Sequence, residues 1–124
     1  MRFLLILLLL AGPAAAQPRA VQAFDGTWVG MRSLQCRAGG RLQNERVTMV
    51  IRNGEVTIPG QQGDPELIGS VDAQGAVRLP RFNMFGEGAG QIRGDQFEGE
   101  HMNRSGNCLI NYTLQREVTA PRRR

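Results

Sequence analysis

From residue 23 onward, apolar and polar residues alternate over short stretches, and no segment follows the 3.6-residue period of a helix. The clearest case is VTMVIRNGEVTI, residues 47–58, where two alternating β-branched runs flank Asn53-Gly54. A two-residue type I′ turn needs positive φ at both central positions, which asparagine and glycine tolerate. The segment therefore predicts a β-hairpin with one apolar face on each arm. These faces are formed by Val47, Met49 and Ile51 on the first arm and by Val56 and Ile58 on the second.

Turn residues divide the following segment into further short strands. A second hairpin is predicted in residues 67–79, with its turn at 72–75, and a third in residues 89–102, with its turn around Gly94. Between them, the aromatic and glycine-rich stretch RFNMFGEG predicts an irregular crossing or a bulged strand.

The first and last strands are predicted at residues 26–36 and 108–116. On the last strand, one face consists of Cys108, Ile110, Tyr112 and Leu114. On the first, Trp28, Leu34 and Cys36 share a face that Gly30 and Arg32 interrupt. With both arms of each hairpin counted, the pattern predicts an all-β fold of about eight strands. Their order favours a single antiparallel meander that forms a small closed barrel or sandwich.

Two features of the N-terminus predict export. The apolar run from Phe3 to Ala11 is too short to span a bilayer, and Ala14-Ala15-Ala16 fits a signal-peptidase site. We therefore expect a signal peptide at residues 1–16, a β-domain at 17–119, a flexible arginine tail at 120–124, and a periplasmic or secreted protein without a transmembrane segment. Whether cleavage follows Ala16 is left open.

The two cysteines, Cys36 and Cys108, are expected to form a disulfide, since an even count in an exported protein favours pairing. This bond would join the first strand to the last and hide the open edges of the meander. A redox or metal pair is disfavoured because the sequence contains no CxxC motif.

The formal net charge of +4 is misleading as a sign of function. Without Arg2 the excess falls to +3 and matches the terminal Arg122-Arg123-Arg124, so the body of the domain is close to neutral. Nucleic-acid binding is therefore not expected. The tail would contact anionic envelope surfaces only weakly, at about 1 kcal/mol per charge.

The stretch Gly26-Thr27-Trp28, together with Arg116 late in the last strand, resembles the calycin-like barrels, which include lipocalins, avidins and bacterial metalloprotease inhibitors. In that group an arginine of the last strand packs across the tryptophan. The FDGTW start and the spacing of the two cysteines also resemble small exported all-β proteins of alphaproteobacteria. The second resemblance implies export, one disulfide and an all-β domain, and it implies no activity.

Five aromatic residues and Arg116 are the candidate ligand-binding set. They are Trp28, Phe82, Phe85, Phe97, Tyr112 and Arg116. The aromatic residues could line a cavity for an apolar ligand, but in a barrel of this size they more often fill the core. We expect the filled core, with Trp28 as a plug.

Residues that could support catalysis are few. His101 is the only histidine, no serine lies in a nucleophile-elbow context, and His101 is expected to be a solvated strand residue. Glu98 and Glu100 project from one face of a strand and could serve a hydrolase or a hard cation, although an outer solvated face is the simpler interpretation.

These observations favour a non-enzymatic envelope protein without cofactor or metal, a binding, inhibitor or accessory module acting through its loops on an unknown partner. Two alternatives remain open: a carrier of a small apolar ligand in the barrel interior, and a hydrolase using Glu98 and Glu100.

Overall fold

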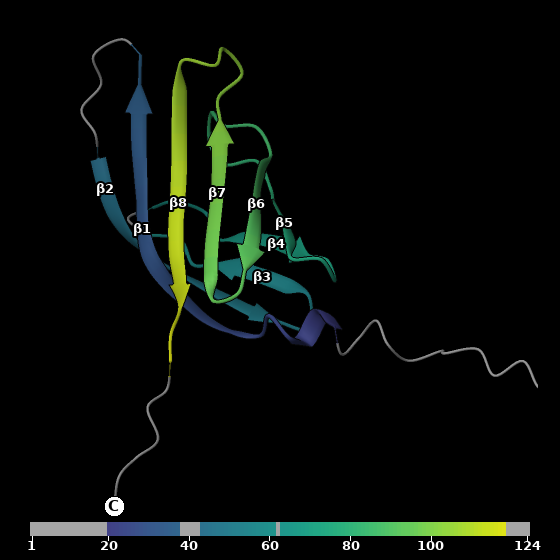
Figure 1. Cartoon of the computed structure of the whole chain (residues 1–124). Helices are drawn as coiled ribbons and strands as arrows, with labels where there is room; N and C mark the ends of the chain where they lie inside the picture. Colours follow the sequence, from purple (N-terminus) through teal and green to yellow (C-terminus); the bar gives the residue numbers. More distant parts are fainter. Residues whose placement is uncertain (1–19, 38–42, 62, 119–124) are drawn as a thin grey trace, which may run out of the picture.

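The computed structural model describes residues 20–37, 43–61 and 63–118, and within them the chain forms one closed antiparallel barrel (Figure 1). The strands are β1 (Gly26–Cys36), β2 (Gln43–Arg52), β3 (Glu55–Ile58), β4 (Leu67–Val71), β5 (Ala76–Leu79), β6 (Gly88–Arg93), β7 (Gln96–Met102) and β8 (Cys108–Arg116). Each strand pairs with its neighbour in sequence, and β8 pairs with β1. The predicted eight-stranded meander is confirmed, and the fold is a barrel.

Pairing between β1 and β8 closes the barrel. The register runs without a break from Trp28 opposite Arg116 to Cys36 opposite Cys108. Every strand therefore has two hydrogen-bonded neighbours, so the barrel has no open edge at which another chain could add a strand.

The predicted turns lie at the expected positions. Asn53 and Gly54 both have positive φ, at 50° and 82°, as the type I′ turn between β2 and β3 requires. In the β4–β5 turn, the Asp72 carboxylate accepts hydrogen bonds from the backbone N–H groups of Gln74 and Ala76, at 2.9 and 3.0 Å. Residues 80–87 form the predicted irregular crossing, in which Phe82 and Phe85 make an isolated bridge.

The barrel interior is filled by side chains from all eight strands. Apolar residues of alternate parity are buried on each strand, as the sequence pattern predicted for β2, β3 and β8. The largest fully buried side chains include Trp28, Tyr112, Phe97, Met49 and Ile51. The inward face of β1, where the sequence pattern was interrupted, contains Trp28 and also the buried Arg32.

The two ends of the barrel differ in the lengths of their connections. In an up-and-down barrel, the β2–β3, β4–β5 and β6–β7 turns lie at one end, called here the turn end, and all three are tight. The connections at residues 59–66, 80–87 and 103–107 lie at the other end, the loop end, and are longer. In Figure 1 the β7–β8 connection is at the top and the β6–β7 turn at the bottom.

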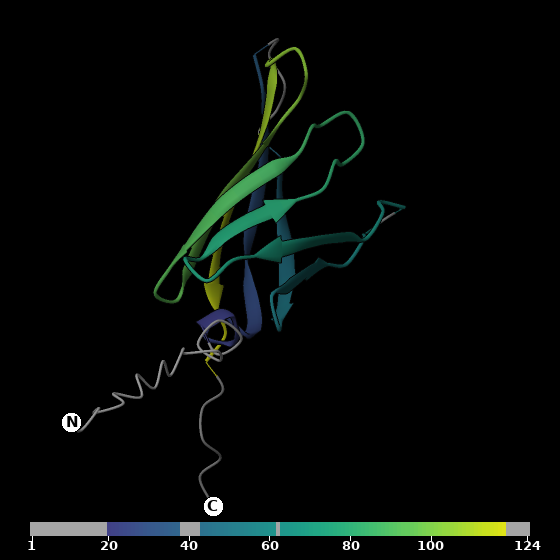
Figure 2. The same ribbon diagram turned by 90° about the vertical axis from the view of Figure 1, so that its right-hand side faces the viewer.

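The N-terminal segment, residues 20–25, covers the turn end. A helical turn at residues 20–22 lies beside the start of β1, at the lower end of the barrel (Figures 1 and 2). The indole N–H of Trp28 donates to the carbonyl oxygen of Phe24 at 3.1 Å. The guanidinium of Arg116 lies 4.7 Å from the centre of the Trp28 ring and donates to the carbonyl oxygen of Ala23 at 2.9 Å. Arg116 is thus packed across Trp28, the arrangement that the resemblance to the calycin-like barrels implies.

Arg116 also makes an ion pair at the turn end. Its Nε lies 3.1 Å from a carboxylate oxygen of Asp95, in the β6–β7 turn, but without the alignment of a hydrogen bond. Because the Asp95 side chain is largely exposed, solvent screens this pair and its contribution to stability is small.

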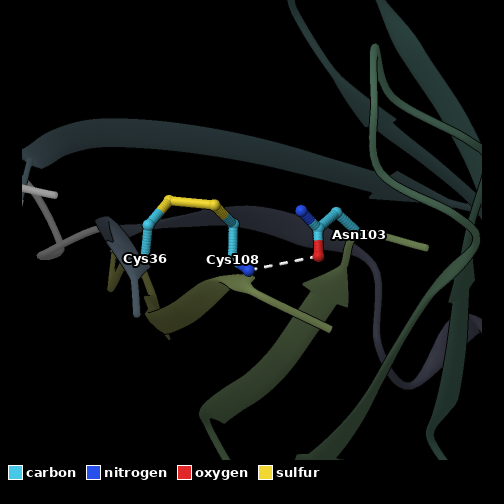
Figure 3. Close-up of a disulfide and its surroundings, with 3 residues drawn as sticks. All are labelled: Cys36, Asn103 and Cys108. Carbon is cyan, nitrogen blue, oxygen red and sulfur yellow. Dashed lines mark hydrogen bonds between the residues drawn. A yellow bond between two sulfur atoms is a disulfide. The ribbon is translucent and has the colours of Figure 1, made fainter. Parts of the chain in front are cut away.

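A disulfide joins Cys36 and Cys108 at the loop end (Figure 3). The two residues are directly opposite each other in the β1–β8 register, so the bond links the strands that close the barrel. Asn103 holds the adjacent loop in place, since its side-chain oxygen accepts a hydrogen bond from the Cys108 N–H at 3.1 Å. The predicted disulfide is confirmed.

Several predictions fall on residues outside the described ranges: the signal peptide at 1–16, the start of the domain at residue 17, its end at 119 and the tail at 120–124. Among the described residues, no helix has the length and apolar character that crossing a bilayer would need.

Candidate functional site

A small pocket opens into the barrel mouth at the loop end. Its volume is about 170 Å³, and it is lined by Arg32, Leu34, Glu45, Asp64, Phe82, Asn83, Phe85 and Ile110. The lining side chains come from β1, β2, β8 and the two connections at residues 59–66 and 80–87. We call this space the mouth pocket.

Arg32 is the central charged group of the mouth pocket. It is only 8% exposed, and it forms a 2.5 Å hydrogen-bonded ion pair with Glu45, a more exposed residue. The Asp64 carboxylate lies 3.9 Å from the same guanidinium nitrogen. The guanidinium also lies over the ring of Phe82, 5.3 Å from its centre, in a cation–π contact. Two carboxylates and an aromatic face therefore hold this buried cation at the mouth.

The protonation of this cluster follows from burial and charge. Burial lowers the pKa of Arg32, but its contacts with Glu45 and Tyr112 outweigh burial, and the pKa lies above its ordinary value. Burial raises the pKa of Tyr112, although the nearby charge of Arg32 partly opposes the rise. At neutral pH the site thus contains a charged guanidinium and a neutral phenol.

His101 is completely buried. The expectation that His101 is a solvated strand residue was therefore wrong. Its Nε2 is 3.0 Å from the carbonyl oxygen of Pro80, and its Nδ1 is 2.9 Å from the hydroxyl of Tyr112. A carbonyl oxygen can only accept, so Nε2 bears the proton. In the neutral ring, Nδ1 then accepts the hydrogen bond that the Tyr112 hydroxyl donates.

The neighbouring strand leaves space for the imidazole of His101. Gly88 is on β6 beside β7, and a Cβ at this position would lie 2.6 Å from the imidazole. The ring is thus buried among Gly88, Pro80 and Tyr112, and burial lowers the pKa of His101 below its ordinary 6.5, with the charge of Arg32 lowering it further. The neutral form is the one that this environment stabilises.

The depressed pKa of His101 predicts that stability depends on pH. Above the unfolded-state value of 6.5 the residue is neutral in both states, and its contribution to stability is complete. As the pH falls below 6.5 towards the lower folded-state pKa, the unfolded chain binds the proton first. Stability should then decrease by up to about 1.4 kcal/mol per pH unit.

Urea denaturation at several pH values between about 7 and 5 measures this effect, in the window set by the reference pKa of histidine. The variant His101→Gln should have a lower stability at neutral pH and a weaker pH dependence, because glutamine does not titrate. Equal slopes for the two proteins would contradict the assignment of the pH dependence to His101.

The environment of His101 does not favour general-base catalysis. Both ring nitrogens are occupied, and the acceptor nitrogen already receives the hydroxyl of Tyr112. Within residues 20–37, 43–61 and 63–118, no three histidine, cysteine, aspartate or glutamate side chains come together as potential metal ligands. The arrangement serves to hold the 80–87 connection, through Pro80, against the barrel.

The structure separates the six predicted ligand-binding residues. Phe82 and Phe85 line the mouth pocket, with ring centres 6.3 Å apart. Trp28 and Arg116 are together at the turn end. Phe97 and Tyr112, with ring centres 6.4 Å apart, pack in the core and are fully or almost fully buried. The aromatic residues thus fill the barrel, and Phe82 and Phe85 are the pair that borders the mouth pocket.

Glu98 and Glu100 lie on the outer wall of β7 and are exposed. They border a shallow hollow on the outer face of β6, β7 and β8, together with Asn111 and Thr113. The two carboxylates share a face of the strand, as predicted, and that face is the solvated one.

Sequence reasoning missed the polar residues of the mouth. In the sequence pattern Arg32 interrupts an apolar face, and neither Glu45 nor Asp64 is among the predicted ligand-binding residues. The alternation of side chains along the strand could have identified Arg32. Residues 28 and 32 lie on the same face of β1, so Arg32 points inward with Trp28. A buried arginine needs a charged partner, so a carboxylate on an adjacent strand is expected beside it.

Comparison of the chain with protein-family models, with curated proteins and with solved structures found no match.

Proposed function

We propose that this protein is an exported, non-enzymatic binding module of the cell envelope that engages its partner through the loop end of the barrel. The observation that carries the proposal is the contrast between the two ends. The turn end is covered by the N-terminal segment and by the packing of Arg116 on Trp28. The loop end has the longer connections and the mouth pocket.

The anchoring of the 80–87 connection supports this proposal, because recognition commonly uses loops supported by a rigid sheet. Phe82 and Phe85 are buried anchors on either side of the exposed Asn83 and Met84. Pro80 is tied to His101, and the disulfide fixes the adjacent ends of β1 and β8. At the 80–87 connection a partner would thus meet an anchored loop, and less ordering entropy would be lost on binding.

The two alternatives have less support. A carrier of an apolar ligand needs interior space, and the interior holds Trp28, Phe97 and Tyr112 in a packed core. The mouth pocket, at about 170 Å³, is small for a carrier. A hydrolase would have to use Glu98 and Glu100 from an exposed wall, where little excludes water.

Site-specific photo-crosslinking in the native cells tests the proposal. A photoreactive amino acid at Asn83, exposed at the loop end, should give an adduct of defined mass on irradiation. The same substitution at Gln74, exposed at the turn end, is the matched control and should give none. Adducts of equal yield from both positions, or none from Asn83, would argue against the loop end as the binding surface.

A further inference from the structure

A second pocket lies beside the Phe82–Phe85 turn, next to the mouth pocket. It has a volume of about 330 Å³ and is lined by Arg81, Asn83, Met84, Phe85, Gly86 and Arg104. The two pockets share Asn83 and Phe85 and differ in charge. In the mouth pocket, Arg32 is matched by carboxylates, whereas the second pocket is lined by two arginines and no carboxylate.

The charge of this second pocket is not compensated locally. Arg81 and Arg104 are both exposed, and within the described part of the chain neither lies within ion-pair distance of a carboxylate. Two guanidinium groups beside one hollow create a positive potential and supply several N–H donors for an oxyanion such as phosphate.

Met84 adds an apolar component next to these charges. Its side chain is 66% exposed, which is unusual for a large apolar residue. The turn holds it outward, because Phe82 and Phe85 are buried on either side and are joined by backbone hydrogen bonds of 3.2 and 2.8 Å. Met84 thus cannot fold back into the core without displacing these anchors.

Met102 extends the apolar surface. It is 50% exposed, and its carbonyl oxygen accepts a hydrogen bond from the Gly86 N–H at 3.0 Å, so it lies beside the Phe82–Phe85 turn. Arg81, Met84, Met102 and Arg104 are called here the arginine–methionine patch. Exposed apolar side chains among cations are typical of a surface that enters the headgroup region of an anionic membrane.

We propose that the arginine–methionine patch docks the protein on an anionic phospholipid surface, with a lipid phosphate held between Arg81 and Arg104 and Met84 inserted beside it. This inference rests on the proposed function, since it uses the same loop end, and it specifies the partner as a membrane surface. Each arginine should contribute about 1 kcal/mol near such a surface, so the loss of both should weaken partitioning about thirtyfold.

Vesicle co-sedimentation of the purified protein tests the docking. Binding is expected to vesicles that contain phosphatidylglycerol, to be much weaker with phosphatidylcholine alone, and to fall as salt screens the charges. The variant Arg81→Gln/Arg104→Gln should bind about thirtyfold more weakly. Met84→Ser should also bind more weakly, by about tenfold, because it removes most of the inserted apolar area.

The matched control is Arg78→Gln/Arg93→Gln, which makes the same change of charge at exposed positions on β5 and at the end of β6. All variants share the same two chain ends, so a difference between the double variants reports the loop end alone. Equal binding of the two double variants, or equal binding to both kinds of vesicle, would overturn the docking proposal.

The two proposals fail in different ways. A protein adduct from Asn83 in cells, with no binding to vesicles, would overturn lipid docking and leave the loop end as the binding surface. Vesicle binding that is insensitive to Arg81 and Arg104, with no adduct from Asn83, would count against both.

Discussion

Replacement of both cysteines by serine, Cys36→Ser with Cys108→Ser, is expected to lower the melting temperature by about 15–30 °C, the shift that a loss of about 4 kcal/mol causes in a domain of this size. The disulfide closes a loop with a sequence separation of 72 residues. The unfolded chain without it gains the entropy of that loop. The expected loss is a large share of the stability of a small domain.

Thermal unfolding followed by circular dichroism, with and without a reducing agent, measures this effect. The reduced native protein should melt at the same temperature as the double serine variant, and the variant should not respond to the reducing agent. The barrel should still form, because the β1–β8 register also includes the backbone pairs from Trp28–Arg116 to Gln35–Leu109. A melting temperature that reduction does not change would refute a stabilising disulfide.

The second large effect is expected at Trp28, the single tryptophan of the chain. Its side chain is completely buried, its indole N–H is bonded to Phe24, and Arg116 covers its ring. Trp28→Ala should cost about 3–5 kcal/mol, because it removes a large buried side chain and leaves a cavity. Trp28→Phe should cost less, since it retains most of the apolar volume.

Urea denaturation of these variants, followed by circular dichroism, gives the free energies of unfolding. Val29→Ala, on the adjacent outward-facing position of β1, is the matched control and should cost about 1 kcal/mol or less. If Trp28→Ala is too unstable to purify, Trp28→Phe remains measurable. A cost for Trp28→Phe no greater than that of Val29→Ala would contradict the role of Trp28 as a core plug.

The mouth of the barrel could be predicted from the sequence only in part. The stretch RFNMFGEG, residues 81–88, predicts an irregular crossing or a bulged strand, since its aromatic residues and glycines do not alternate. The ion pair of the buried Arg32 with Glu45 was not predicted. Glu45 is on β2, and only the pairing of β1 with β2 brings it opposite Arg32.

The sequence alone determined the local features of this protein. The positions of the turns follow from residues such as Asn53 and Gly54, because both tolerate the positive φ that the turn requires. Strand parity follows from alternation, because side chains of a strand point to opposite faces in turn. The disulfide pairing follows from the presence of two cysteines.

Only the tertiary structure decided the features that depend on distant segments. The pairing of β1 with β8 made the fold a barrel, and that pairing joins the two ends of the domain. The burial of His101 depended on Pro80, Gly88 and Tyr112, which come from a loop and two neighbouring strands. A polar strand residue is buried only where such partners satisfy its hydrogen bonds. These partners become known only when the strands are placed in space.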